Sequence, residues 1–404
     1  MSLHLYKDHI DDLSVTALGE TSGYKAVGRY YLEKRNPFEY DENIIRFSNG
    51  AAFDFFDGED WKQVCNRGTM DFDPLQHLDI PAASYRMGAD YSIYLCLTGS
   101  GVSIVVSENS TFPAGFNADN SRKIGGFHYG TIRRVTLADG LMIPIDSNGV
   151  RFGNTGMRWH DNVVDGIIPN SVWDLRNCPK TPRGGMVKVG DLWVSIYLAS
   201  AKSPITFMGG PNTGLHVASG ELQSRYGQLP VTGAEGMNQF TFSELARLSG
   251  MRLPFFTEWL AAAFGNPQGN PQGGAAANDY GWTNGSSRAR TGCRVDGTTG
   301  EHDPLAGIKP FAVSAYNVVD CVGNVREWLS DYTVRQDTTS WGWFDVVGEG
   351  MGQAELPNSN GISALSVGGH WVSGPMAGPR TVDLLSRPWD RTTGTGARLA
   401  CDAA

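Results

Sequence analysis

The sequence predicts an α+β fold in which a β-rich N-terminal domain, residues 1–165, precedes a second domain, residues 166–404. Glycine supplies 51 of the 404 residues and aromatic residues 11%, whereas charged residues supply only 19%. Such a composition favours loop-rich β structure over a helical bundle. A second indication is the order of patterns along the chain, because strand-like runs fill the first half and two helical patterns follow in the second.

The charge and the N-terminal residues argue against two classes of partner. The net charge is −9 and no basic run occurs, which disfavours an extensive nucleic-acid interface. The N-terminus is polar and lacks the apolar core of a signal peptide, and no apolar run reaches the length of a membrane span. We therefore expect no nucleic-acid partner, no membrane insertion and a cytoplasmic location on synthesis.

The first half contains a clear hairpin pattern. Two β-rich runs, Tyr91–Leu97 and Val102–Val106, flank the turn Thr98-Gly-Ser-Gly101. The histidine of Gly125-Gly-Phe-His128 is a candidate ligand or base. Because no second histidine, cysteine or carboxylate lies at metal-ligand spacing, we expect it to be a packed or surface histidine.

The sequence character changes between residues 160 and 170. From there, residues 171–175, 184–189 and 192–198 carry apolar and aromatic residues at strand spacing. The Gly-rich stretches 265–300 and 331–365 predict loops.

Two helices are expected between these regions. The first begins at the capping-box pattern Thr241-Phe-Ser-Glu244 and ends at Ser249-Gly250. The second covers residues 255–264 and ends at Gly265. Its core-facing residues are expected to be Phe256, Trp259, Leu260 and Ala263.

The six cysteines are scattered and include no CxxC pair, so we expect buried free thiols rather than disulfides or a zinc site. They are Cys65, Cys96, Cys178, Cys293, Cys321 and Cys401.

The C-terminal segment 368–398 combines two interleaved sets of residues. One set has the Gly, Pro, Trp and Arg residues that fix a backbone: Gly368, Gly369, Trp371, Gly374, Ala377, Gly378, Pro379, Arg380, Pro388, Trp389, Gly396, Ala397 and Arg398. The residues between them share no chemistry, which is typical of side chains displayed by a scaffold. These candidate ligand-binding residues are His370, Val372, Ser373, Pro375, Met376, Thr381, Asp383, Leu385, Ser386, Asp390, Thr392, Thr393 and Thr395.

Four motifs in order resemble the C-type-lectin-type fold of the formylglycine-generating-enzyme (sulfatase-modifying factor) family over residues 166–404. They are Gly250-Met-Arg-Leu-Pro254 with Glu258-Trp259, then Gly323-Asn-Val-Arg-Glu-Trp328, Gly368-Gly-His-Trp371 and Gly396-Ala-Arg398. The resemblance implies partly buried acids, Glu258 and Glu327, which need partners among Arg252, Arg326, Arg380 and Arg398. It also implies an aromatic core of Trp259, Trp328 and Trp371.

The family's enzymatic chemistry is not expected here. Its oxidases resemble this chain but need a cysteine pair in the C-terminal segment, and no cysteine lies between Cys321 and Cys401. Val372 and Met376 occupy that region, and neither supplies a thiolate. The related enzymes that form sulfur–carbon bonds need a histidine triad, which the eight scattered histidines do not indicate. A metal-dependent oxidase or sulfur-transfer enzyme of this type is the alternative to a non-catalytic protein.

The closing segment is similar to the variable proteins of diversity-generating retroelements, in which adenine-specific mutagenesis rewrites Asn codons. Changing both adenines of AAC yields codons that never encode Lys, Glu, Gln, Trp or Met. Residues 361–404 contain no Lys, Glu, Gln or Asn. Twelve of the thirteen candidate residues fit the accessible set, and Met376 does not.

The resemblance therefore implies a ligand-binding protein whose target is a protein or other macromolecule on a cell surface. The N-terminal domain is expected to serve attachment or assembly, for example in a phage or prophage particle. No catalytic residue and no cofactor is expected. A structural calcium ion held by Asp320, Asn324 and Asp331 is an open alternative to turn and capping roles for these residues.

Overall fold

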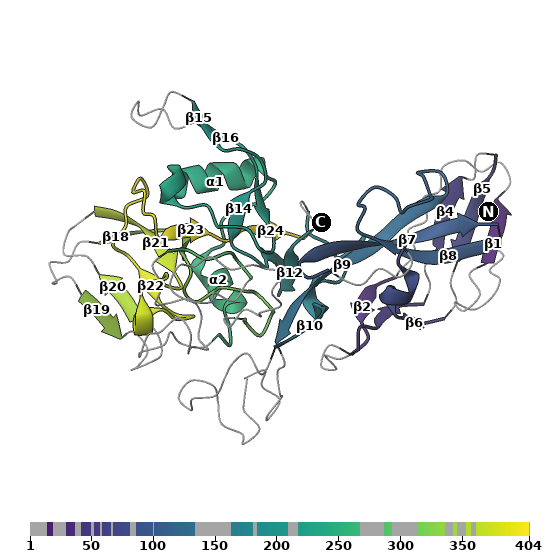
Figure 1. The fold of residues 1–404 in the computed structure, drawn as a ribbon, viewed down its shortest axis with the longest axis horizontal. Helices are drawn as coiled ribbons and strands as arrows, with labels where there is room; N and C mark the ends of the chain where they lie inside the picture. Colours follow the sequence, from purple (N-terminus) through teal and green to yellow (C-terminus); the bar gives the residue numbers. More distant parts are fainter. Residues whose placement is uncertain are drawn as a thin grey trace, which may run out of the picture. The chain divides into compact units, whose positions relative to one another are not determined.

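The computed structural model of the chain divides into two compact units (Figure 1). The first contains residues 1–130 and 165–178 with residue 404, and the second contains residues 131–164 and 179–403. The predicted division into 1–165 and 166–404 stays a prediction. The structure describes residues 14–18, 30–36, 42–49, 52–56, 59–65, 68–80, 86–99, 101–133, 163–180, 184–208, 217–266, 287–292, 313–335, 342–345, 353–356 and 361–403.

The first unit is built around a five-stranded sheet in the order β10-β9-β7-β8, with β11 paired to β9. The expected hairpin is confirmed, since Thr98 pairs with Gly101 across the turn. The strands are β7 (Ala89–Thr98), β8 (Gly101–Ser107), β9 (Ser121–Arg133), β10 (Val163–Ile167) and β11 (Trp173–Asp174).

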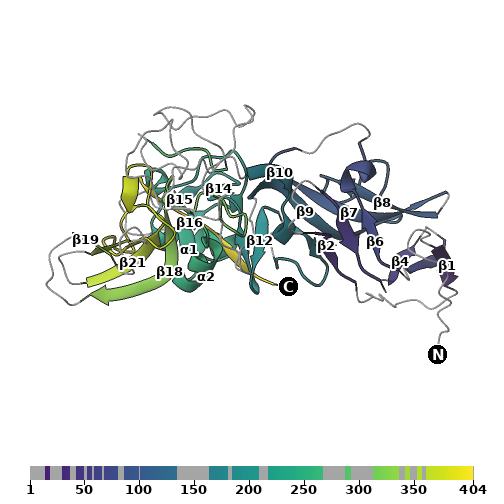
Figure 2. The same cartoon turned by 90° about the horizontal axis from the view of Figure 1, so that it is seen from below.

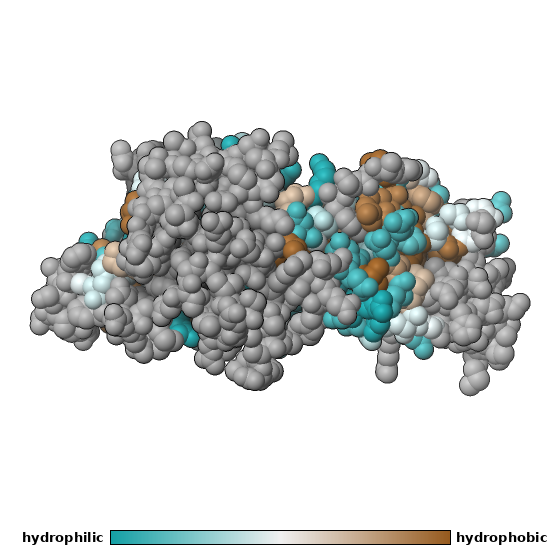
Figure 3. Space-filling model, turned by 60° about the horizontal axis from the view of Figure 1, so that its bottom comes forward, coloured by the Kyte–Doolittle hydropathy of each residue, from teal (hydrophilic) through white to brown (hydrophobic). Residues whose placement is uncertain are grey.

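Two three-stranded sheets complete the described part of this unit, in the orders β1-β5-β4 and β2-β3-β6. Their strands are β1 (Ser14–Leu18), β2 (Leu32–Lys34), β3 (Ile45–Phe47), β4 (Ala52–Phe56), β5 (Trp61–Cys65) and β6 (Met70–Phe72), and the 3₁₀ helix η1 (Pro74–His77) follows. Figure 3 shows apolar side chains gathered on part of this unit's surface and bordered by hydrophilic ones.

The core of the first unit packs aliphatic and aromatic side chains from these sheets, including Phe47, Ile93 and Phe127. His128 is buried beside them, with its Nδ1 atom 2.7 Å from the Asp90 Oδ1 atom. The expectation of a packed histidine is confirmed.

The second unit contains a six-stranded sheet in the order β19-β20-β22-β21-β18-β23. Figure 2 shows β18 and β21 running side by side. The strands are β18 (Arg326–Arg335), β19 (Gly342–Asp345), β20 (Gln353–Leu356), β21 (Gly361–Val367), β22 (Val382–Asp383) and β23 (Thr395–Ala397). The expectation of a loop over 331–365 was wrong, because four of these strands lie partly or wholly inside that range.

Smaller sheets surround this one. A three-stranded sheet has the order β12-β13-β24, and β14 pairs with β17 as β15 pairs with β16. Their bounds are β12 (Met186–Val189), β13 (Leu192–Ser195), β14 (Ala199–Ala201), β15 (Thr206–Met208), β16 (Val217–Ser219), β17 (Leu222–Ser224) and β24 (Ala400–Asp402). Short 3₁₀ helices are η3 (Pro169–Ser171, in the first unit), η4 (Gly233–Glu235) and η6 (Gly374–Met376). Most of the loop expected at 265–300 lies outside the described residues.

The first α-helix, α1 (Gln239–Leu248), begins earlier than expected. Its cap is Asn238, whose Oδ1 atom accepts hydrogen bonds from the Thr241 backbone N (3.0 Å) and Oγ1 (2.9 Å). The predicted cap at Thr241 was therefore wrong, since Thr241 lies within the first turn. Asparagine is as effective a cap as serine or threonine, so Asn238 can begin the helix three residues earlier.

The second α-helix, α2 (Phe256–Ala262), faces the core with Trp259, Ala262 and Ala263. Phe256 and Leu260, which were also expected there, are only half-buried. No helix among the described residues is long and apolar enough to cross a membrane.

The described cysteine side chains agree with the sequence expectation. Cys96, Cys178, Cys321 and Cys401 are buried, and Cys96 and Cys321 are free thiols. The side chains of Cys65 and Cys293 lie outside the described residues.

Candidate ligand-binding site

The predicted binding segment is fixed to β18 at both of its ends. Glu327 pairs with Val367 of β21 on one side and with Gly396 of β23 on the other. Residues 368–395 therefore lie between the two strand partners of Glu327, one antiparallel and one parallel. Between these two ends the chain is mostly irregular, with only η6 and the two-residue strand β22.

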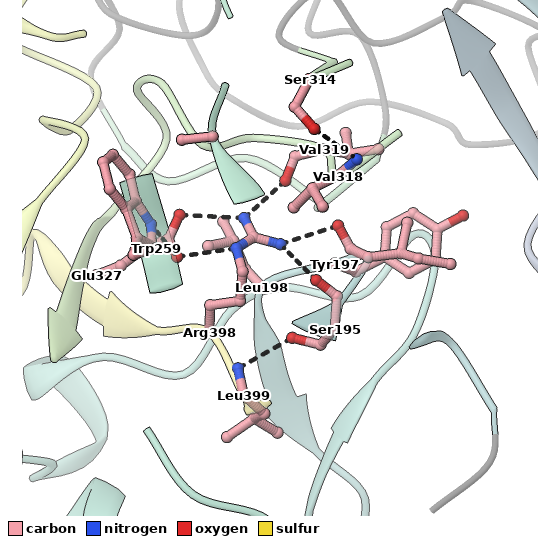
Figure 4. Close-up of polar contacts among 12 residues, drawn as sticks. Ser195, Tyr197, Leu198, Trp259, Ser314, Val318, Val319, Glu327, Arg398 and Leu399 are labelled. Atoms are coloured by element: carbon pink, nitrogen blue, oxygen red, sulfur yellow. Dashed lines mark hydrogen bonds and ion pairs between the residues drawn. The ribbon is translucent and has the colours of Figure 1, made fainter. Parts of the chain in front are cut away.

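A buried ionic network lies where this segment ends (Figure 4). Arg398 donates from Nε and Nη2 to the two carboxylate oxygens of Glu327, at 2.9 and 3.0 Å. Trp259 donates from Nε1 to the same carboxylate at 3.0 Å. Both charged side chains are fully buried. Burial raises the pKa of the Glu327 carboxyl, whereas the charge of Arg398 and the two donors favour its ionised form.

Arg398 also donates hydrogen bonds to backbone carbonyl oxygens that are distant in the sequence. Its Nη1 atom donates to the carbonyl oxygens of Ser195 and Ile196, both at 2.9 Å, and Nη2 donates to the carbonyl oxygen of Val319 at 2.7 Å. The end of the binding segment is thus joined to β13 and to the turn before β18. A planar guanidinium is the side chain that can make such a fork of contacts.

The second predicted acid also has its arginine. Arg252 binds Glu258 through two hydrogen bonds, both of 2.8 Å. Burial alone would raise the pKa of Glu258, but Arg252 and the Phe255 N–H lower it below its ordinary value. Both predicted acids are thus paired with arginines from the expected set. The two pairs belong to the scaffold.

The structure separates the thirteen candidate residues by exposure. Val372 (56%), Leu385 (41%) and Thr393 are exposed. His370, Met376, Asp390 and Thr392 are half-buried, and the side chain of Pro375 lies outside the described part. The other five are buried: Ser373, Thr381, Asp383, Ser386 and Thr395.

The buried members make hydrogen bonds within the segment. Ser373 Oγ accepts from the His370 backbone N at 2.9 Å. Thr381 Oγ1 donates to the Met376 carbonyl oxygen at 2.6 Å, and the Thr395 hydroxyl lies 2.6 Å from that of Thr392. These side chains shape the loops from which the exposed ones project. The composition of the segment gave no signal of this difference.

Asp383 belongs to a charged cluster that the sequence did not indicate. Arg326 lies 3.0 Å from the Asp383 carboxylate and 3.2 Å from that of Glu355. Burial raises the pKa of Asp383, while Arg326 and the Leu385 N–H oppose that change. Glu355 was missed because it lies in the stretch that was expected to be a loop.

His370 lies at the start of the segment and packs between a tryptophan and a glycine. Its ring stacks on Trp371 with a centroid distance of 5.4 Å. A Cβ atom at Gly394 would lie 2.1 Å from the His370 ring. Burial and then the charge of Arg326 lower the pKa of His370 from 6.5 to about 4. The imidazole is therefore neutral near pH 7.

Two tryptophans that were expected to build the fold lie at the surface instead. Trp259 and Trp328 are fully buried, as predicted. Trp371 is only half-buried beside His370, and Trp389 is 51% exposed. The prediction of a core role for Trp371 was wrong, because an aromatic residue in a Gly-rich pattern can equally be displayed. Trp389 was expected only among the residues that fix the backbone, and its side chain is exposed.

The loop around Thr392 packs against the turn at Gly233, where there is no room for a side chain. Gly233 N donates to the Thr392 carbonyl oxygen at 3.1 Å. A Cβ atom at Gly233 would lie 2.5 Å from backbone atoms of Arg391 and Thr392. Arg288 and Glu235 form an ion pair that supports this turn.

The three calcium candidates bind protein donors. Asp320 accepts from the Gly292 N at 2.9 Å, and Asn324 accepts from the Ala289 N at 2.9 Å. Asp331 accepts from the Phe256 N at 2.7 Å, at the first residue of α2. These contacts correspond to turn and capping roles.

Two family models match the chain. One, described as the Mtd second domain, matches residues 67–155, and the other, a sulfatase-modifying factor enzyme 1-like domain, matches residues 212–403. Residues 212–403 are similar to this second family and are named the sulfatase-modifying-factor-like domain. The family resemblance predicted from the sequence is thereby confirmed. Both ion pairs, Arg252–Glu258 and Arg398–Glu327, lie within this sulfatase-modifying-factor-like domain.

Similar proteins cover both units. The tail fiber receptor-binding protein of Bordetella phage BPP-1 is 24% identical over 403 residues, which is 95% of this chain and 89% of that protein. Solved structures of the Major Tropism Determinant, the M1 and P3c variants, align with TM-scores of 0.57 at 19% and 20% identity. Each alignment covers 93% of this chain and 86% of the other. The sulfatase-modifying-factor-like domain thus has a C-type lectin-like fold.

Proposed function

We propose that the chain is a non-catalytic receptor-binding protein, and that segment 368–398 contacts a protein or other macromolecule on a cell surface. The observation that carries this proposal is the nearly end-to-end alignment with a phage tail fiber receptor-binding protein. The first unit would then attach the chain to a phage or prophage particle. Residues 67–155 match the model described as the Mtd second domain, and the part of this range up to residue 130 lies in the first unit.

The exposure of the candidate residues distinguishes those that can contact a target directly from those that set the loop conformation. We assign direct target contact to the exposed and half-buried residues, which are His370, Val372, Met376, Leu385, Asp390, Thr392 and Thr393. The buried ones, such as Thr381 and Thr395, would act indirectly by setting loop conformation. A rigid scaffold lets such contacts vary without loss of the fold.

Retroelement diversification would explain why these residues share no chemistry. It is supported by the absence of Lys, Glu, Gln and Asn from residues 361–404. The DNA around the gene tests it directly. A near-copy of the 3′ end that differs at adenines, beside a reverse-transcriptase gene, is the expected finding, and a genome without such a copy would refute diversification.

An enzyme of the formylglycine-generating type is not favoured. The C-terminal segment has no cysteine between Cys321 and Cys401. Burial also raises the pKa of the Cys321 thiol, which disfavours the reactive thiolate. Oxidation of a cysteine-containing peptide by the purified chain with copper would reverse this conclusion.

Binding to intact bacteria tests the receptor-binding role. The fluorescently labelled full chain is titrated onto a panel of bacterial strains, and the seven contact residues are then exchanged together within the AAC-derived codon set. The exchange should abolish or redirect binding, while Phe112→Ala, an exposed change in the first unit, should leave it unchanged. Binding that survives the exchange at full strength would contradict the proposal.

A further inference from the structure

Three exposed aromatic side chains lie beside the predicted binding segment or within it. Phe240 at the start of α1 is 49% exposed, Tyr332 on β18 is 48% exposed and Trp389 is 51% exposed. Exposed aromatic rings leave apolar area in water, which is unfavourable unless a partner covers them. Their grouping therefore needs an explanation beyond the fold.

The buried residue Gln239 contacts Tyr332 through its side chain and the residue before Trp389 through its backbone. The Phe240 and Tyr332 rings lie 6.4 Å apart, and the Tyr332 hydroxyl donates to Gln239 Oε1 at 2.6 Å. The backbone N of Gln239 donates to the carbonyl oxygen of Pro388 at 3.1 Å, directly before Trp389. The start of α1, which carries Phe240, is thus hydrogen-bonded to the segment that carries Leu385, Trp389 and Asp390.

Two aliphatic side chains extend this surface along the β18–β21 pair. Val334 lies two residues beyond Tyr332 and so projects from the same face of the strand. Ile362 is its direct partner on β21. Val334 is 60% and Ile362 47% exposed, and a cross-strand aliphatic pair of this kind offers a flat apolar area.

The three aromatic residues are constant if the segment is diversified as proposed. Tryptophan cannot arise from an AAC codon by adenine changes. The other four residues lie outside the proposed variable segment 368–398: Phe240, Tyr332, Val334 and Ile362. With constant aromatic side chains next to variable ones, affinity and selectivity for the target can come from different residues. Large rigid rings supply much of the affinity at protein interfaces, and neighbouring contacts supply selectivity.

We propose that Phe240, Tyr332 and Trp389, with Val334 and Ile362, form a constant apolar surface that binds apolar side chains of the same protein target as the variable segment. The inference rests on the proposed receptor-binding function. It deepens that function by specifying a protein target with an apolar patch beside the region read by the variable residues.

The test uses a bacterial strain that the labelled native chain binds. Phe240→Ala, Trp389→Ala and Val334→Ser are each expected to weaken binding, by about tenfold or more for the aromatic changes. Tyr332→Ala removes the third ring and should weaken binding in the same way. Phe112→Ala is the matched control for an exposed aromatic side chain elsewhere. Thermal unfolding and light scattering of every variant check the fold and the oligomeric state.

The outcomes separate this inference from the proposed function. If exchanging the seven contact residues alters binding but the constant-surface variants bind like the native chain, the inference alone is overturned. If light scattering shows that Phe240→Ala or Val334→Ser dissociates an oligomer, the surface joins copies of the chain and the inference is again overturned. A native chain that binds none of the strains overturns the proposed function, and the inference falls with it.

Discussion

Arg398 donates hydrogen bonds of 2.9 and 3.0 Å to the two carboxylate oxygens of Glu327, and both side chains are fully buried. Glu327 is also the residue whose backbone pairs with the strands at both ends of the binding segment. One ion pair therefore secures the position of the loops that carry the candidate contact residues.

Breaking this pair should destabilise the domain strongly. Glu327→Gln leaves Arg398 buried without a counter-charge, and Arg398→Lys cannot reproduce the fork of contacts. Each change is expected to lower the free energy of unfolding by about 3–5 kcal/mol, measured by urea denaturation. The exposed Lys202–Glu221 pair provides the control, since Glu221→Gln should cost less than about 1 kcal/mol. Equal effects at the two sites would contradict the assigned role.

Stability should depend on pH through His370. The folded-state pKa of about 4 lies below the ordinary value of 6.5, so the unfolded chain binds a proton that the folded chain does not. The contribution of His370 is fully present above pH 6.5 and is lost as the pH falls towards 4. His370→Asn should remove this component, so the melting temperatures of native and variant chains should converge or cross on acidification. Parallel curves over this interval would exclude the effect.

The cap of α1 should depend on Asn238 rather than on the Thr241–Glu244 pattern. Asn238→Ala removes the acceptor of two hydrogen bonds and is expected to cost about 1 kcal/mol. Glu244→Ala is the comparison and should change stability by less than about 0.5 kcal/mol. Chemical denaturation of the two variants measures the difference, and the opposite order would place the cap at Thr241.

Target binding should be sensitive to Gly233. In Gly233→Ala the new methyl group would meet backbone atoms of Arg391 and Thr392, so the loop that carries Thr392 and Thr393 must move. We expect weaker cell binding and a stability loss of about 1–3 kcal/mol. Gly99→Ala adds a methyl group with nothing within 4 Å and should be silent in both assays. Unchanged binding by Gly233→Ala would show that the position of this loop is unimportant.

The scaffold could be predicted from sequence better than the surface. Glu258 and Glu327 were assigned arginine partners correctly, because a carboxylate that is partly or fully removed from water is stabilised by a nearby cation. Trp371 was misassigned to the core, since periodicity is weak in an irregular segment and cannot show which way a ring points. Glu355 and the burial of Asp383 depend on the parallel pairing of β20 and β22, a long-range contact that local patterns do not encode.

The pairing of Val367 and Gly396 on either side of Glu327 has a consequence for how this protein can evolve. The two ends of residues 368–395 are held a fixed short span apart, whatever lies between them. The entropic free-energy cost of closing a loop rises only with the logarithm of the loop length, by about 0.6 kcal/mol for each doubling. Relatives of this chain can therefore gain or lose residues within the segment, as well as exchange them. The pairing of its two ends with β18 would be kept.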